Sequence, residues 1–143
     1  MTTHSPSPLH ILLVEQDEAI RELISTLLQA HGHTVGMAHD GASALQQVAI
    51  QTPHAVFASL VFADMDGFAL CRRLRALPAT SASLIVALTG YSESGIQERV
   101  AQAGFDSYLL KPVSVLTLLS SLESFSARRA AAQDSGQLIS MAA

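Results

Sequence analysis

The sequence predicts an α/β protein: one doubly wound, five-stranded parallel sheet with five helices. Two patterns lead to this fold class. Five short apolar runs of strand length alternate with segments whose apolar residues recur at helical spacing. Strands that alternate with helices form parallel sheets, and right-handed crossovers place the helices on both faces. The 143 residues are the length of one domain.

Three strands and two helices are expected in the first part of the chain. Apolar runs predict strands at 10–14, 34–38 and 54–58. Acidic Asp17 and Glu18 begin the first helix, because its dipole favours negative charge there. The apolar stripes of the two helices are Ile20, Leu23, Ile24, Leu27 and Leu28, and then Ala42, Leu45, Val48 and Ala49.

The second part of the chain is expected to add two strands and three helices. The strands are predicted at 84–88 and 106–110, and Lys111-Pro112 ends the last one. Asp66 is a suitable cap for the third helix, and Gly104 ends the fourth. The apolar stripes are Leu70, Cys71, Leu74 and Leu77, then Ile96, Val100 and Ala103, and finally Val115, Leu118, Leu119, Leu122 and Phe125.

The ends of the chain differ from its middle. Residues 1–8 contain two prolines among small polar residues and predict a disordered tail. The folded domain is expected over 9–127. In 128–143 the periodicity weakens, and the sequence does not decide between a frayed tail and an extension of the last helix. No internal repeat is recognisable and no second domain fits, which predicts a single-domain protein or a piece of a longer one.

The composition excludes several classes of protein. The chain is 49% hydrophobic and 14% charged, unlike a disordered chain. A net charge of −4 argues against nucleic-acid binding through phosphates. No apolar run is long enough for a membrane span, and no signal peptide is recognisable. The lone Cys71 excludes an internal disulfide and a Cys-rich zinc site. We therefore expect a soluble cytoplasmic protein.

Polar residues follow the predicted strands, where ligands bind in doubly wound sheets. Glu15, Gln16 and Asp17 follow the first strand, and Ser59 follows the third. The fourth and fifth are followed by Thr89 and by Lys111, the only lysine in the chain.

Four stretches of the sequence resemble one family. They are ILLVEQDE at 11–18, FASLVFADMDG at 57–67, ALTG at 87–90 and YLLKP at 108–112. Together they resemble the receiver domain of two-component response regulators over residues 9–126. The resemblance implies a flavodoxin-like fold with strand order 2-1-3-4-5 and a role in bacterial phosphorelay signalling.

The resemblance also implies a site. In the family, an aspartate after strand three accepts a phosphoryl group from a histidine kinase, and an acidic pair helps it to hold Mg²⁺. A hydroxyl and a lysine contact the phosphoryl oxygens. The residues that match these positions are Glu15 for the first acid, Thr89 for the hydroxyl, Lys111 for the lysine and Tyr108 for an aromatic that moves with the hydroxyl.

Two positions depart from the family. Ser59 stands where the acceptor aspartate is usual, and Gln16 replaces the second acid of the metal pair. A serine hydroxyl without an adjacent base is a poor nucleophile, and one carboxylate binds Mg²⁺ weakly. We therefore expect a pseudo-receiver that is not an enzyme, has no bound metal or other cofactor, and acts by binding signalling proteins such as a histidine kinase or an effector. A homodimer through helix four, strand five and helix five, near Tyr91 and Tyr108, is one expected association.

Three alternatives stay open. In the first, the chain is a true phosphorelay receiver with another acceptor, such as Asp64 or Asp17. In the second, it is an engineered non-phosphorylatable variant. A flavodoxin-type ligand site is the third, although the acidic turn at 15–18 would repel phosphate.

The remaining candidates receive structural interpretations. Ser59 lacks the flanking glycines of a hydrolase nucleophile. Asp17 is interpreted as a helix residue, and Cys71 as a core residue. The arginines at 72, 73 and 75 are expected on a solvated face. None of the six histidines has metal-ligand spacing on one element, and His31 and His33 are expected at the surface.

Overall fold

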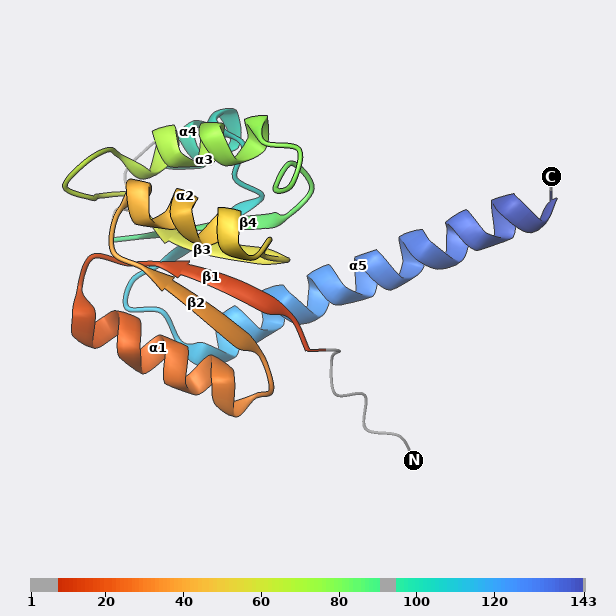
Figure 1. Cartoon of the computed structure of the whole chain (residues 1–143), viewed down its shortest axis with the longest axis horizontal. Coiled ribbons are helices and arrows are strands. Elements are labelled where there is room, and N and C mark those ends of the chain that lie inside the picture. Colours follow the sequence, from red (N-terminus) through yellow and green to blue (C-terminus); the bar gives the residue numbers. More distant parts are fainter. Residues whose placement is uncertain (1–7, 91–94, 143) are drawn as a thin grey trace.

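Five parallel strands form one sheet in the order β2-β1-β3-β4-β5, as predicted (Figure 1). This computed structural model describes residues 8–90 and 95–142, with 133–142 as backbone only. The strands are β1 (His10–Val14), β2 (Thr34–Ala38), β3 (Ala55–Ser59), β4 (Leu84–Thr89) and β5 (Ser107–Leu110). The helices are α1 (Glu18–Ala30), α2 (Gly41–Ile50), α3 (Gly67–Ala76), α4 (Ile96–Ala103) and α5 (Val115–Ala142).

The helices form two layers around the sheet (Figure 1). Alternate strand residues point to opposite faces, so Val56 and Ala58 of β3 meet α2, α3 and α4, while Ala55 and Phe57 face α1 and α5. β3 and β4 are buried along their whole length. A strand covered on both faces reads as a continuous apolar run, which is why these strands were recognisable in the sequence.

Aspartates begin three of the helices. Asp17 accepts a hydrogen bond from the Ile20 N–H, and Asp66 accepts one from the Ala69 N–H, so the predicted cap of α3 is confirmed. Asp40 forms a capping box with Ser43 at the start of α2. These carboxylates satisfy backbone donors that the first turn of a helix leaves without partners.

The predicted apolar stripes are right for α4 and partly wrong for α1 and α2. On α1, Ile24 and Leu28 are buried, but Ile20 is 40% and Leu23 is 60% exposed. On α2 the buried residues are Gly41, Ala44 and Val48. Small residues hide the register of this helix, because alanine is common on both faces. The predicted Ala42 and Ala49 are exposed for that reason, and Leu77 after α3 is also 37% exposed.

Helix α5 continues through the segment for which the sequence left two alternatives open. It runs from Val115 to Ala142 and extends beyond the body of the domain (Figure 1). The predicted disordered tail falls mainly on residues 1–7, which lie outside the described residues. Within the part of the chain that the structure describes, no helix is both long and apolar enough to cross a membrane.

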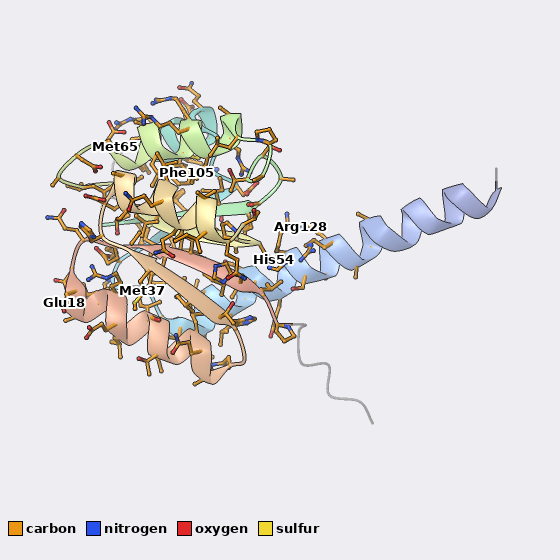
Figure 2. All side chains as sticks on the ribbon, viewed as in Figure 1. Glu18, Met37, His54, Met65, Phe105 and Arg128 are labelled. Atoms are coloured by element: carbon orange, nitrogen blue, oxygen red, sulfur yellow. The ribbon has the colours of Figure 1, made fainter. Side chains whose placement is uncertain are left out.

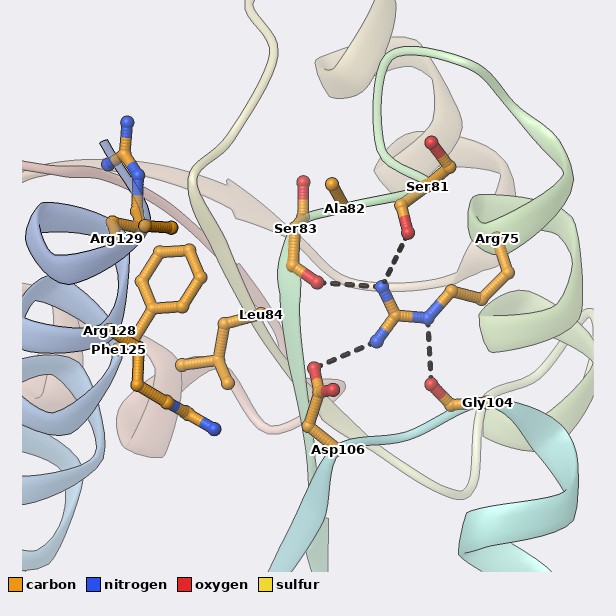
Figure 3. A pocket seen from close by; sticks show the side chains of 11 residues that line it. Arg75, Ser81, Ala82, Ser83, Leu84, Gly104, Asp106, Phe125, Arg128 and Arg129 are labelled. Atoms are coloured by element: carbon orange, nitrogen blue, oxygen red, sulfur yellow. Dashed lines mark hydrogen bonds and ion pairs between the residues drawn. The ribbon is translucent and has the colours of Figure 1, made fainter. Parts of the chain in front are cut away.

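The expectation of a solvated basic face holds for the exposed Arg72 and Arg73 and is wrong for Arg75. Its Nε donates to the Gly104 carbonyl at 2.7 Å, and its Nη1 donates to the carbonyls of Ser81 and Ser83 at 3.1 and 2.7 Å. Its Nη2 forms an ion pair with Asp106 Oδ2 at 2.8 Å (Figure 3). The guanidinium thus joins the end of α3 to the amino ends of β4 and β5.

We predict that Arg75→Ala lowers the free energy of unfolding by about 1–3 kcal/mol, because it leaves partly buried carbonyls without their donor. Arg72→Ala is the matched control, since Arg72 is exposed on the same helix, and should change stability by less than about 0.5 kcal/mol. Urea unfolding of both variants tests this, and equal effects would contradict a special role for Arg75.

Candidate functional site

The carboxyl edge of the sheet carries a small pocket. Its volume is about 340 Å³, and its lining includes Ser59, Thr89, Gly90 and Lys111. These residues follow or end β3, β4 and β5, so the parallel topology brings together side chains that are far apart in the sequence. The position of the pocket agrees with the general rule for doubly wound sheets.

Glu15 is the centre of the polar contacts beside this pocket. Its side chain is 4% exposed, and Lys111 Nζ lies 2.7 Å from its Oε1 atom. The Ser59 hydroxyl donates to the same oxygen at 2.9 Å. The Asp17 N–H donates to Oε2 at 3.2 Å. One buried carboxylate therefore has a cation, a hydroxyl and a backbone amide as partners.

These partners decide the protonation state of Glu15. Burial alone would raise the pKa of the carboxyl. The hydrogen bonds from Lys111, Asp17 and Ser59, together with the charge of Lys111, outweigh burial and hold the pKa below its ordinary value of 4.5. Glu15 is therefore ionised at neutral pH.

The Ser59 hydroxyl has an adjacent carboxylate, which the sequence did not reveal. Ser59 is the last residue of β3 and is 3% exposed, with its hydroxyl directed at Glu15. A carboxylate whose pKa is lowered by an ion pair is a weak general base for a serine hydroxyl. The contact orients Ser59 and contributes little to its nucleophilicity.

The two residues that follow Glu15 in the sequence do not line the pocket. Gln16 is exposed, and Asp17 caps α1 through its Oδ1 atom. Arg21, which the sequence did not single out, donates from Nη1 to the Glu15 carbonyl at 2.7 Å. This bond holds the turn after β1 against the first helix.

Thr89 and Tyr108 occupy neighbouring strands. Thr89 is the buried last residue of β4, and its carbonyl accepts a hydrogen bond from the Lys111 N–H at 2.7 Å. Tyr108 pairs with Ala87 in the β4–β5 register and packs, partly buried, against the core on the α3 and α4 side. Tyr91 lies outside the described residues.

The loop after Ser59 is attached to helix α2. Asp64 Oδ1 accepts from the Gly41 N–H at 3.0 Å, and Oδ2 accepts from the Ala42 N–H at 2.8 Å. These bonds lower the pKa of Asp64. Both oxygens of this alternative acceptor are thus engaged at a helix amino terminus.

Gly67 closes the same loop. A Cβ atom at this position would lie 2.4 Å from the Ser59 carbonyl oxygen and 2.7 Å from the Leu60 Cα. The Gly67 N–H donates to the Leu60 carbonyl at 2.9 Å. Only glycine allows the start of α3 to approach the end of β3 this closely.

Other candidate residues lie away from the pocket. Cys71 is 1% exposed, which confirms it as a core residue, and burial raises the pKa of its thiol to about 11. His33 is 4% exposed, so the expectation of a surface residue is wrong for it, while His31 is exposed. His33 accepts a hydrogen bond from the Leu9 N–H, a partner 24 residues away that local sequence does not reveal.

Comparison with protein families gives one match over most of the chain. Residues 11–123 match the response regulator receiver domain. The chain is 35% identical over 136 residues to the response regulator MprA of Mycobacterium avium (strain 104), covering 93% of this chain and 57% of that protein. It is 39% identical over 112 residues to MprA of Mycobacterium ulcerans (strain Agy99), covering 76% and 46% respectively. The chain thus spans about half the length of the curated relatives it matches.

Solved structures agree with this match. A putative response regulator from Chloroflexus aurantiacus J-10-fl superposes with a TM-score of 0.78 at 29% identity, covering 85% of this chain and 99% of that one. A response regulator receiver domain (CheY-like) from Methylobacillus flagellatus superposes with a TM-score of 0.75 at 32% identity, covering 83% and 99%.

Proposed function

This chain belongs to the response regulator receiver domain family, and from that premise we propose that it is a pseudo-receiver, which signals by binding proteins and is not phosphorylated at the usual position. One observation carries the proposal. The Ser59 hydroxyl and Lys111 Nζ both contact Glu15 Oε1, and Ser59 is the residue that the resemblance matches to the acceptor position. The lysine that would contact a phosphoryl group already has an anionic partner.

The charge at this edge supports the proposal. Phosphoryl transfer to a receiver needs a carboxylate nucleophile, together with cations that hold the spreading negative charge. Ser59 offers a neutral hydroxyl, and the charge of Lys111 is compensated by Glu15 at 2.7 Å. The pocket therefore has neither an unpaired carboxylate nor an unengaged cation among these three residues.

The Mg²⁺ that the family implies does not fit this set of donors. Mg²⁺ favours several hard oxygen ligands in octahedral geometry. Glu15 uses both oxygens for protein donors, Ser59 is neutral, and Gln16 is an exposed amide. We propose that the ion binds weakly or not at all, and we derive no step through it.

The geometry favours this function over a receiver with another acceptor. Asp64 and Asp17 are the alternative carboxylates, and each accepts hydrogen bonds from the first turn of a helix. A nucleophilic attack by either one would remove an acceptor from that turn. An engineered substitution at Ser59 would leave Gln16 unexplained.

The output that we propose is association with other proteins. The chain would act as a non-enzymatic module in the cytoplasm, with a histidine kinase, a downstream effector or a second copy as partner. The candidate surface combines α4, β5 and α5, where Tyr108 and the 47% exposed Leu110 lie on one strand. Tyrosine suits such a surface because it adds apolar area with a polar tip.

We predict that the chain gains no phosphoryl group when it is incubated with a small acyl phosphate and Mg²⁺, because the carboxylate acceptor is missing. Intact mass measures the result. The double variant Gln16→Asp with Ser59→Asp is the positive control and should gain one phosphoryl group. A phosphoryl group mapped to Ser59 of the unmodified chain contradicts the proposal, and one mapped to Asp64 or Asp17 supports the alternative acceptor instead.

A second prediction concerns stability. Millimolar Mg²⁺ should leave the melting temperature of the unmodified chain nearly unchanged. In the same double variant, carboxylate repulsion at the edge lowers the metal-free melting temperature, and the ion restores it. At ten times the dissociation constant the gain is about 1.4 kcal/mol, or roughly 3–6 °C. Thermal melts with and without the ion measure this, and a rise of several degrees in the unmodified chain is the contrary result.

A third prediction concerns the association surface. Tyr108→Glu should weaken association with a second copy or a partner at least tenfold, about 1.4 kcal/mol, since it places an uncompensated charge in the contact. Sedimentation velocity measures the self-association. Leu110→Glu tests the same strand at a residue that is more exposed than Tyr108, so that a loss of core packing does not explain the result. Ile50→Glu on α2, where Ile50 is 76% exposed, is the control. Unchanged association in both β5 variants sinks this assignment.

A further inference from the structure

Three histidines gather at the amino edge of the sheet, opposite the candidate site. They are His10 on β1, His33 just before β2 and His54 just before β3. The Leu9 N–H donates to His33 Nδ1 at 3.1 Å, and the His10 N–H donates to His54 Nδ1 at 2.9 Å. The start of β1 is thus held on both sides by imidazole nitrogens of its two neighbouring strands.

These contacts extend the backbone ladder of the sheet. The Leu9 carbonyl accepts from the Thr34 N–H at 3.0 Å, and the His10 carbonyl accepts from the His54 N–H at 2.8 Å. The N–H groups of the same two residues, Leu9 and His10, donate to imidazole nitrogens instead of backbone carbonyls. The two Nδ1 atoms thus take the role that a carbonyl oxygen of a neighbouring strand has within a sheet, and they satisfy N–H donors that would otherwise be costly to bury.

Each of these imidazoles must be neutral to make its contact. A backbone N–H only donates, so Nδ1 must carry a lone pair and the ring proton must be on Nε2. A protonated ring carries hydrogen on both nitrogens, and its Nδ1–H would face the backbone N–H. Charging His33 or His54 therefore breaks the hydrogen bond that holds Leu9 or His10.

We propose that this histidine cluster is a proton-sensitive attachment of the start of β1, which releases the Leu9–His10 backbone when His33 and His54 become charged. The cluster would make the amino edge of the sheet responsive to mild acid. This inference concerns the opposite edge of the molecule and does not depend on the proposed pseudo-receiver function.

The surroundings of the cluster oppose protonation in the folded chain. Burial lowers the pKa of all three histidines, and His54 acts further on His10, His31 on His33, and Arg129 of α5 on His54. Figure 2 shows His54 beside the part of α5 that carries the labelled Arg128. His33 Nε2 has no hydrogen-bond partner among the described residues, and the Thr34 hydroxyl contacts His10 Nδ1 at 2.7 Å. No carboxylate is among these groups.

The sign of the pH effect follows from these lowered pKa values. The unfolded chain binds protons near the ordinary histidine pKa of 6.5, while the folded chain binds them only at lower pH. Stability contributed by the neutral cluster is complete above pH 6.5 and decreases as the pH falls below it. Local opening at Leu9 and His10 should increase over the same range.

Amide hydrogen exchange of the full chain at pH 7.5 and 5.5 tests the proposal. After correction for intrinsic rates, we expect the Leu9 and His10 amides to exchange roughly fivefold faster at the lower pH, the factor for losing one ordinary hydrogen bond. His33→Asn with His54→Asn should abolish this change, because Asn Oδ1 offers an acceptor at the same place in the side chain and does not titrate. His39→Asn is the control, since His39 is largely exposed at the other edge of the sheet and should leave the change intact.

Two results overturn the proposal: equal protection of both amides at the two pH values, or the same acid-induced loss in the double asparagine variant. If that variant does not fold, imidazole ¹⁵N shifts of the unmodified chain decide. Unprotonated Nδ1 atoms in His33 and His54 at pH 7.5, with apparent pKa values below 6.5, support the attachment. A proton on Nδ1 of either ring at pH 7.5 refutes it.

Discussion

The contact between Lys111 and Glu15 joins the ends of β5 and β1 across the two strands that lie between them in the sheet. The residues are 96 positions apart in the sequence, and their charged atoms meet at 2.7 Å beside the Ser59 hydroxyl. Isolated burial of Glu15 would be costly, and its three donors compensate for the lost water. The carboxyl edge thus has a balanced charge, and every functional interpretation of the pocket depends on this balance.

Much of the fold could be predicted because it depends on local patterns. β1 and β2 follow from their apolar runs, and Asp66 as a cap follows from its place before a helical stripe. The same reasoning located Ser59 and Lys111 at one edge, since parallel strands end together. It failed for Arg75 and His33. Their partners lie up to 31 residues away, and neither a charged nor an imidazole side chain signals burial by itself.

The two edges of the sheet are held in different ways. At the carboxyl edge, charges of opposite sign meet over Ser59, and the contacts among side chains define the pocket. At the amino edge, side chains bind backbone groups: Arg75 donates to three carbonyls, and His33 and His54 accept from amides. Contacts to backbone groups do not depend on the identity of the partner residue. The contacts of the amino edge therefore depend on the side chains that reach the backbone and not on the side chains of their partners, whereas the chemistry of the carboxyl edge changes with each side chain.

Because Gly67 lies so close to the Ser59 carbonyl, substitutions at position 59 and at position 67 have different consequences. The backbone at position 59 is confined by a neighbour that has no side chain, while the side chain at 59 contacts a different residue, Glu15. Replacing the side chain at 59 changes what the edge can bind or accept and leaves the path of the loop intact. Adding a side chain at 67 would displace the backbone of position 59 whatever residue stood there. One substitution at position 59 can therefore remove or restore a chemical group at this edge, while the glycine at position 67 preserves the backbone of the loop.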